Sequence, residues 1–291
     1  MKDFKKRLVH LHHCRGVGWN QIYTILKKDP QLKYLYQMKQ IDFTSSQTSS
    51  KNTLTDLYSQ NIMNNILQYE RLDIKTTTIF DPDYPPILRE TYKPPWVIYS
   101  RGNFNMLHRE RLLAVVGSRL ATNYGKNAIE LLFPSLIRQK YVIVSGLAIG
   151  VDAYAHATTI KLKGETIGVI AGGFNHLYPK ENIPLAQEMM KNHLVISEYP
   201  PNTRPEKWHF PMRNRIIAGI SHGTLVVEAK KSSGSLITAN YAVQEGRDVF
   251  SIPGPISSPF SIGTNELIQQ GAKLVQTSQD IIEELSYPEK R

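Results

Sequence analysis

Cysteine is almost absent from this sequence of 291 residues, which contains only Cys14. A single thiol cannot form an intrachain disulfide, so a disulfide-stabilised secreted fold is excluded and a reducing compartment is expected, by default the cytoplasm. Long apolar runs are missing as well: no stretch of about 18 apolar residues occurs, and His10, His12 and His13 interrupt the place where a signal peptide has its apolar core. We therefore expect no membrane-spanning segment.

Motifs for cofactors and metals are also missing. The loop after the first predicted strand of the main domain lacks G-x-G-x-x-G, and the strand predicted over 141–145 has no terminal acidic residue to bind a ribose, which argues against NAD. No G-x-x-x-x-G-K-[ST] occurs, which excludes a P-loop ATPase, and no Cys and His residues have the spacing of a zinc site. We expect no cofactor, no metal and no catalytic residue.

Positive charge is in excess, with 35 Lys and Arg against 25 Asp and Glu and a net charge of +10. Such an excess favours a polyanionic partner, either nucleic acid or an anionic membrane surface. A basic surface that is merely solvated explains the same excess. Hydrophobic residues make up 41% of the chain, so a folded protein with one large and one smaller domain is expected.

The first 110 residues form two different segments. Residues 1–72 have apolar positions at helical spacing and predict a small all-helical domain, interrupted by a flexible polar loop over Thr44–Thr55. Within this domain, Arg15–Gly18 fits either a helix-hairpin-helix turn that contacts a DNA phosphate or a plain turn between two helices. Residues 73–110 contain several prolines and predict an extended connector.

From residue 111 to residue 291, short apolar runs alternate with helical segments. This alternation predicts an α/β fold, a Rossmann-like parallel or mixed sheet covered on both faces by helices. Ligands bind such folds at the carboxyl ends of the strands, so the loops that follow the strands are the candidate sites. The runs predicted as strands are Leu112–Val116, Tyr141–Val144, Thr166–Ile170, Leu194–Ile196, Thr224–Val227, Val249–Ile252 and Lys273–Val275.

The first of these loops contains Gly117, Ser118 and Arg119, before a helix expected to begin near Thr122 or Asn123. Glycine lets the backbone approach a phosphate, serine and exposed amides donate to it, and arginine adds a planar charged group. We interpret this turn as a site that binds the phosphate backbone of a nucleic acid. An ordinary turn with a solvated arginine is the alternative.

The loop after the second run begins with Ser145 and Gly146 and leads to Asp152 and His156, four residues apart on one helical face. The pair fits a catalytic role, but no nucleophile or third metal ligand is near in sequence, so we favour a structural role for both. After the third run, Lys180 is expected at the rim of the same crevice, beside Asn182.

Two later loops add polar groups at helix starts. Arg213, Asn214 and Arg215 follow Trp208 and Phe210, and arginines beside aromatic rings suit phosphates and unstacked bases, although a local salt bridge and buried rings are the alternative. A second loop, Ser233–Gly234–Ser235, fits an anion-binding helix start or plain N-capping. We expect Glu228 to orient one of the two arginines.

Taken together and in order, these loops resemble those of the DNA-processing protein DprA (Smf) family. The segments that carry the resemblance are Val116–Arg119, Ser145–His156, Tyr178–Asn182, Ser197–Pro200, Phe210–Ser221, Val226–Ala229 with Ser233–Ala239, Gly246–Gly254, and Gly263–Asn265 with Leu267–Ala272.

The resemblance implies an extended Rossmann fold, single-stranded DNA as a partner, protection of incoming DNA in natural transformation, and loading of the recombinase RecA onto that DNA. It also implies a homodimer and an N-terminal domain similar to a sterile alpha motif. In the family, the basic pocket uses an arginine and a lysine that match Arg119 and Lys180, and the two R-N-R arginines match Arg213 and Arg215.

Two functions from different classes remain. The first is a non-catalytic protein that binds single strands through Gly117, Ser118, Arg119, Ser145, Gly146, Lys180, Asn182, Arg213, Asn214, Arg215, Ser233, Gly234 and Ser235. The alternative is an enzyme similar to Rossmann-like nucleoside-monophosphate phosphoribohydrolases, for which the segment Leu236–Asn240 lacks the expected glutamate. A scaffold for a recombinase or an uptake machine is compatible with the first.

Overall fold

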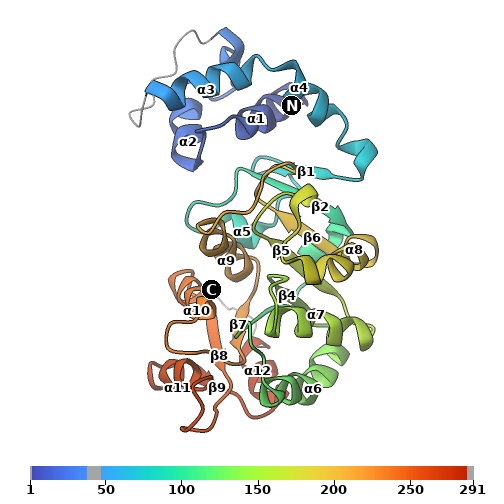
Figure 1. Cartoon of the computed structure of the whole chain (residues 1–291), viewed down its shortest axis with the longest axis vertical. Coiled ribbons are helices and arrows are strands. Elements are labelled where there is room, and N and C mark those ends of the chain that lie inside the picture. The colour runs from blue at the N-terminus through green and yellow to red at the C-terminus, as the bar shows by residue number, and fades with distance from the viewer. Residues whose placement is uncertain (1, 38–46, 287–291) are drawn as a thin grey trace.

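A nine-stranded sheet is the centre of the computed structural model, which describes residues 2–37 and 47–286 (Figure 1). The strand order is β1-β2-β6-β5-β4-β3-β7-β8-β9; the pairs from β6 to β9 are parallel, whereas β1 pairs with β2 and β2 with β6 in antiparallel fashion. The strands are β1 (Lys75–Thr78), β2 (Val97–Gly102), β3 (Leu112–Val116), β4 (Val142–Ser145), β5 (Thr166–Ile170), β6 (Leu194–Ser197), β7 (Gly223–Val226), β8 (Asp248–Ser251) and β9 (Lys273–Leu274).

Each of the seven apolar runs predicted from the sequence forms a strand, which confirms the α/β fold. The central strands β3, β4, β5 and β7 are buried at every position because both faces of the sheet are covered. In β3, Leu113 and Val115 pack with α6 and α7, whereas Ala114 and Val116 face the core beneath α9 and α10. The helices of this part are α5 (Pro86–Arg89), α6 (Asn123–Arg138), α7 (Val151–Lys161), α8 (Ile183–Asn192), α9 (His209–Gly219), α10 (Gly234–Gln244), α11 (Ile262–Gln269) and α12 (Ser278–Leu285).

The N-terminal helices are α1 (Lys2–His13), α2 (Trp19–Lys28), α3 (Gln47–Leu57) and α4 (Gln60–Leu67), and they lie at one end of the molecule (Figure 1). A flexible loop was predicted over Thr44–Thr55. This prediction is wrong from Gln47 onward, because that part of the segment belongs to α3. Residues 44–46 lie outside the part of the chain that the structure describes. Tertiary contacts stabilise this polar helix, because Asp56 pairs with Arg15 at 2.8 Å and Leu57 is buried.

The segment 73–110, expected to be a connector, supplies β1 and β2 to the sheet. Its prolines lie between the two strands, where no ladder hydrogen bonds are required, and Val97–Ser100 are fully buried. The sequence pattern was misleading because short strands flanked by prolines resemble an irregular extended chain. The division of the chain into domains at residues 72 and 110 stays a prediction.

The N-terminal helices dock onto β2 and its preceding loop. Trp19 stacks on Trp96 with ring centroids 5.1 Å apart, and its Nε1 donates to the Pro94 carbonyl at 2.8 Å. His12 and His13 lie against Tyr99 of β2 with ring centroids 5.8 and 5.7 Å away. Helices and sheet therefore share a single apolar cluster.

His156 of α7 is a core residue and is fully buried. Its Nδ1 lies 2.6 Å from Thr166 Oγ1, whose only proton is donated to the Ile143 carbonyl at 2.7 Å. The imidazole therefore donates from Nδ1 and is neutral, and burial lowers its pKa from 6.5 to about 3. This residue joins α7 to β4 and β5, as the structural interpretation of the sequence expected.

The depressed pKa of His156 predicts a loss of stability on acidification. Between pH 6.5 and about 3, the unfolded chain binds a proton at this residue that the folded chain does not bind. The free energy of unfolding should therefore fall as the pH is lowered through this window, with this residue contributing up to about 1.4 kcal/mol per pH unit. Urea unfolding of the wild type and of His156→Gln at pH 7 and pH 5 measures it; equal pH dependence in the two proteins would contradict it.

Candidate nucleic-acid interface

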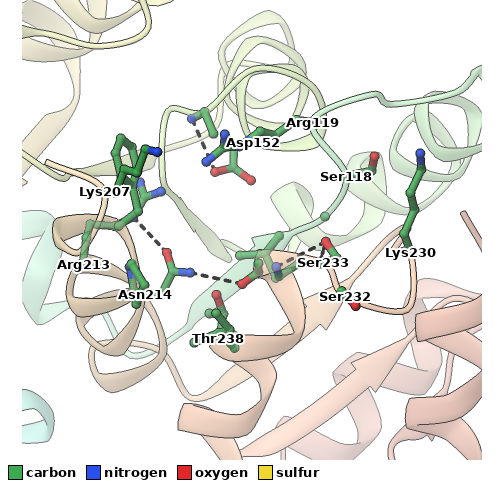
Figure 2. Close-up of a pocket in the computed structure, with 18 of the residues that line it drawn as sticks. Ser118, Arg119, Asp152, Lys207, Arg213, Asn214, Lys230, Ser232, Ser233 and Thr238 are labelled. Carbon is green, nitrogen blue, oxygen red and sulfur yellow. Dashed lines mark hydrogen bonds between the residues drawn. The ribbon is translucent and has the colours of Figure 1, made fainter. Parts of the chain in front are cut away.

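A pocket of about 810 Å³ opens at the carboxyl ends of the strands, where the loops after β3 and β7 meet the first turns of α9 and α10 (Figure 2). Eight of the thirteen residues predicted to bind DNA line it: Gly117, Ser118, Arg119, Arg213, Asn214, Ser233, Gly234 and Ser235. The position agrees with the general rule for α/β sheets. Whether these residues contact DNA stays a prediction.

The turn after β3 presents Arg119 to the pocket. The Ser118 hydroxyl accepts from the Leu120 amide at 3.0 Å, and its carbonyl accepts from the Val151 amide at 3.0 Å. Gly150 has a φ of +85°, and a Cβ there would lie 2.3 Å from the Ser118 carbonyl oxygen. The turn is therefore fixed against the start of α7, while the exposed Arg119 side chain extends over the Phe210 ring, 5.7 Å from its centroid.

Arg213 lines the pocket, but its guanidinium points into the protein. The residue is 5% exposed, and its Nη1 donates to the Gly146 carbonyl and, at 2.7 Å, to the Val169 carbonyl. A Cβ at Gly146 would lie 2.0 Å from this nitrogen, so the glycine makes room for the arginine. Burial raises the pKa of Asp152 above its usual value, and the nearby Arg213 charge opposes that shift.

Arg215 lies outside the pocket. It is 8% exposed and forms a salt bridge of 2.5 Å with Glu198, and its Nη1 donates to the Lys93 carbonyl at 3.0 Å. Residues two positions apart in a helix point in directions about 200° apart, so Arg213 and Arg215 have different neighbours. The alternative interpretation of this segment, a local salt bridge, is therefore correct for Arg215, which pairs with Glu198.

The expected role of Glu228 is wrong. Its carboxylate accepts from the backbone amide of Thr122 at 2.9 Å and from the Thr122 hydroxyl at 2.5 Å, so it caps the start of α6 and orients neither arginine. Gly125 in the first turn of α6 permits this approach, because a Cβ there would lie 2.4 Å from a Glu228 oxygen.

The start of α10 faces the pocket and is joined to α9. Asn214 Nδ2 donates to the Gly234 carbonyl at 3.2 Å, and the Ser233 side chain caps the helix by accepting from the Ser235 amide at 3.4 Å (Figure 2). N-capping therefore accounts for Ser233. The partial positive charge of this helix end still points toward the pocket and favours an anion there.

The five remaining predicted residues do not line the main pocket. Ser145 is fully buried and donates to the Val115 carbonyl at 2.6 Å, and Asn182 donates to the Leu147 carbonyl at 2.9 Å. Gly146 and Arg215 have the structural partners described above. Lys180 is exposed and lies two residues beyond Tyr178, which does line the pocket.

Two cations in the lining, Lys207 and Lys230, were not predicted (Figure 2). Both are exposed, and Lys230 Nζ lies 4.8 Å from the centroid of the Phe260 ring. In the sequence, the only indication that Lys207 belongs to the site is its position directly before Trp208, where the aromatic segment begins. Of the expected aromatic anchors, Phe210 lines the pocket beside Tyr178, whereas Trp208 is 58% exposed and donates to Glu206 at 2.6 Å.

Asp152 and His156 do not form a pair at the site. Asp152 lines the pocket with its carboxylate beside the Ala148 amide, 3.4 Å away, whereas His156 lies in the core. In residues 2–37 and 47–286, no three His, Cys, Asp or Glu side chains are grouped so as to hold a metal ion. Across the same residues, no helix is both long and apolar enough to cross a membrane.

Comparison with known proteins gives consistent results. The family model described as DNA recombination-mediator protein A matches residues 75–286. The DNA processing protein DprA of Bacillus subtilis is 47% identical over 235 residues, which cover 81% of this chain and 79% of that protein. The corresponding protein of Streptococcus pneumoniae is 46% identical over 210 residues, covering 72% of this chain and 74% of that one.

Solved structures agree with the sequence comparisons. The X-ray structure of DprA from Streptococcus pneumoniae superposes with a TM-score of 0.83 at 36% identity, covering 98% of this chain and 99% of that one. A DprA structure from Helicobacter pylori, described by its single-stranded DNA binding mode, has a TM-score of 0.66 at 30% identity and covers 73% of this chain and 96% of that one. The resemblance stated from the sequence is confirmed, and the chain belongs to the DNA recombination-mediator protein A family, whose members are named DprA or Smf.

Proposed function

We propose that this chain binds single-stranded DNA in the pocket at the carboxyl edge of the sheet. The observation that carries the proposal is the combination of exposed cations and aromatic rings there. Arg119, Lys207 and Lys230 are exposed in the lining, which also contains the rings of Phe210 and Tyr178. Cations that follow a backbone, together with rings on which bases stack, are the general means of binding single strands. The Helicobacter pylori relative, described as binding single-stranded DNA, supports the same function.

The division of tasks follows from burial. The three exposed cations meet phosphates, and the start of α10 adds a fixed partial charge without a mobile side chain. The Phe210 and Tyr178 rings meet edge to face, with centroids 5.9 Å apart and planes at 72°, so they offer surfaces of different orientation to unstacked bases. Stacking of this kind is tolerant of base identity. The site therefore binds strands of many sequences.

We also propose that the protein holds strands without turnover. Two buried carboxylates near the pocket have structural tasks: Asp152 lies beside the buried Arg213, and Glu228 caps α6. Purified protein incubated with nucleoside monophosphates should release no free base. Release of base that disappears in an Asp152→Asn variant would favour the phosphoribohydrolase alternative.

The finer part of the proposal concerns the fate of the strand. We propose that a homodimer of this chain protects incoming DNA in the cytoplasm during natural transformation and loads RecA onto it. The description of the matching family as a recombination mediator supports this role.

The loading role predicts a change in RecA kinetics. Adding this protein to single strands coated by a general single-strand-binding protein should shorten the lag before RecA hydrolyses ATP, because the bound protein exchanges the coat for recombinase. The measurement is a coupled ATPase assay. An unchanged lag, or equal shortening by a variant that no longer binds DNA, would contradict the loading role.

Neutralising the exposed cations predicts a loss of binding. Arg119→Ala with Lys207→Ala should weaken binding of a fluorescent oligothymidylate about tenfold or more and reduce the slope of log affinity against log salt by about 1.4, or about 0.7 per phosphate contact. Fluorescence anisotropy over a range of salt concentrations measures both values. Arg138→Ala is the matched control, since Arg138 is an exposed arginine at the opposite edge of the sheet. Equal behaviour of the two proteins would reject the pocket as the binding site.

The buried pair gives a contrasting prediction. Arg215→Ala leaves the Glu198 carboxylate buried without its partner and should lower the free energy of unfolding by about 3 to 5 kcal/mol. Arg119→Ala should change it by no more than about 0.5 kcal/mol, because that side chain is exposed. Combining Arg215→Met with Glu198→Leu should restore much of the loss, since no charge then remains buried. Denaturant unfolding measures all three; equal stability of the Arg215→Ala and Arg119→Ala proteins would contradict the assignment.

A further inference from the structure

Five aromatic rings form a continuous row between the N-terminal helices and the segment before β2. Its members, Phe4, Phe80, Trp96, Trp19 and Tyr23, follow one another at centroid distances of 5.2, 6.1, 5.1 and 5.5 Å. We call this the aromatic row. The last step is nearly parallel, with 15° between the planes of Trp19 and Tyr23. The row therefore ends on a tyrosine ring whose orientation continues the stack.

The inner and outer parts of the row have different tasks. Trp96 is 8% exposed and donates from Nε1 to the Trp19 carbonyl at 3.1 Å, so it joins the helices to the sheet. Tyr23 at the end is 51% exposed, and Tyr92 beside the row is 74% exposed. Lys93 Nζ lies 5.7 Å from the Trp19 ring centroid and 5.2 Å from that of Tyr92. The ammonium group is thus close to the exposed ring of Tyr92 and to the half-buried ring of Trp19, on which Tyr23 stacks.

The Tyr92–Lys93 loop is held in place from two sides. The Lys93 carbonyl accepts from Arg215 Nη1 at 3.0 Å, and the Tyr92 amide donates to Glu245 Oε1 at 3.0 Å. Lys93 has a φ of +51°. Residues other than glycine seldom adopt this backbone conformation, so the surrounding contacts must maintain it. Lys93 is half-buried, and these backbone contacts fix the position from which its side chain extends.

These anchors belong to the helices that form the pocket. The first turns of α9 and α10 line the pocket, and the Tyr92–Lys93 loop is attached to Arg215 of α9 and to Glu245 at the end of α10. The 11 residues of α10 span about 16 Å. In Figure 1, α9 lies between α10 and the end of the molecule that carries α2. The Tyr92–Lys93 loop is therefore attached to α10 at the end opposite the pocket, about one helix length away.

We propose that Tyr92, Lys93 and Tyr23 form a second contact site for single-stranded DNA, separate from the pocket and reached by the same strand. Bases stack on the two tyrosine rings, and the Lys93 ammonium meets a phosphate between them. The inference rests on the proposed function of the pocket. Tyr34, in the same helical region, is 62% exposed but makes no ring contact with another described aromatic residue, so exposure of a tyrosine alone does not produce this arrangement.

Strand length separates the two sites in an experiment. A short oligothymidylate of about 6 nucleotides fills only the pocket, whereas one of about 20 nucleotides reaches both sites. The Tyr23→Ala, Tyr92→Ala double variant should bind the long strand about tenfold more weakly and the short strand unchanged. Tyr34→Ala is the matched control and should bind both like the wild type. An unchanged affinity of the double variant for the long strand, or an equal loss for both lengths, would overturn the second site.

The cation is tested by Lys93→Gly, because glycine adopts a φ of +51° freely and the variant removes only the side chain. It should unfold like the wild type and show a salt slope reduced by about 0.7 for the long strand alone. In a Trp208→Phe background the two remaining tryptophans, Trp19 and Trp96, both belong to the aromatic row, so only the long strand should quench fluorescence. No quenching by the long strand would count against the site.

Failure of the pocket is distinguishable from failure of the second site. If the wild type binds neither oligonucleotide, the proposed function is wrong and the second contact is wrong with it. If the Arg119→Ala, Lys207→Ala protein loses both strands while the tyrosine variant loses neither, the pocket stands and the second site is refuted.

Discussion

A buried guanidinium, that of Arg213, holds the carboxyl edge of the sheet together. The carbonyls of Gly146 and Val169, at the ends of β4 and β5, need hydrogen-bond partners where the ladders end, and Arg213 supplies both. Removing a guanidinium from water is costly, and the neighbouring Asp152 carboxylate offsets part of that cost. With the strand ends fixed in this way, the turn after β3 can present Arg119 outward. The cation that builds the site and the cation that meets a ligand are thus two different arginines.

The sequence predicted the sheet well because burial on both faces imposes a simple rule on composition. Runs such as Leu112–Val116 are apolar at every position, and no other local structure explains so many of them at regular spacing. The prediction failed where tertiary contacts outweigh local pattern. Asp56 and Leu57 stabilise α3 through partners far away in sequence, and β2 is a strand because it pairs with β6, which the prolines around it conceal.

The sequence placed the site correctly at the carboxyl ends of the strands, but it did not show which arginines are exposed to a ligand and which are buried. Sequence alone places Arg119, Arg213 and Arg215 in equivalent loops, and which of them is exposed depends on partners such as Glu198 that no local pattern reveals. Gly146 was predicted to bind DNA, and the structure places the Arg213 guanidinium in the space where a side chain of residue 146 would lie. Lys207 and Lys230 were overlooked because a single lysine carries no motif.

Three consecutive residues of α9 are bound in three directions. Arg213 reaches the strand ends, Asn214 reaches the start of α10, and Arg215 reaches the loop before β2. The helix cannot rotate or slide along its axis without breaking at least one of these attachments. Its orientation is therefore set before any ligand arrives, and binding at its first turn requires little ordering of the protein. The affinity of such a site is limited by the flexibility of the ligand rather than by that of the receptor.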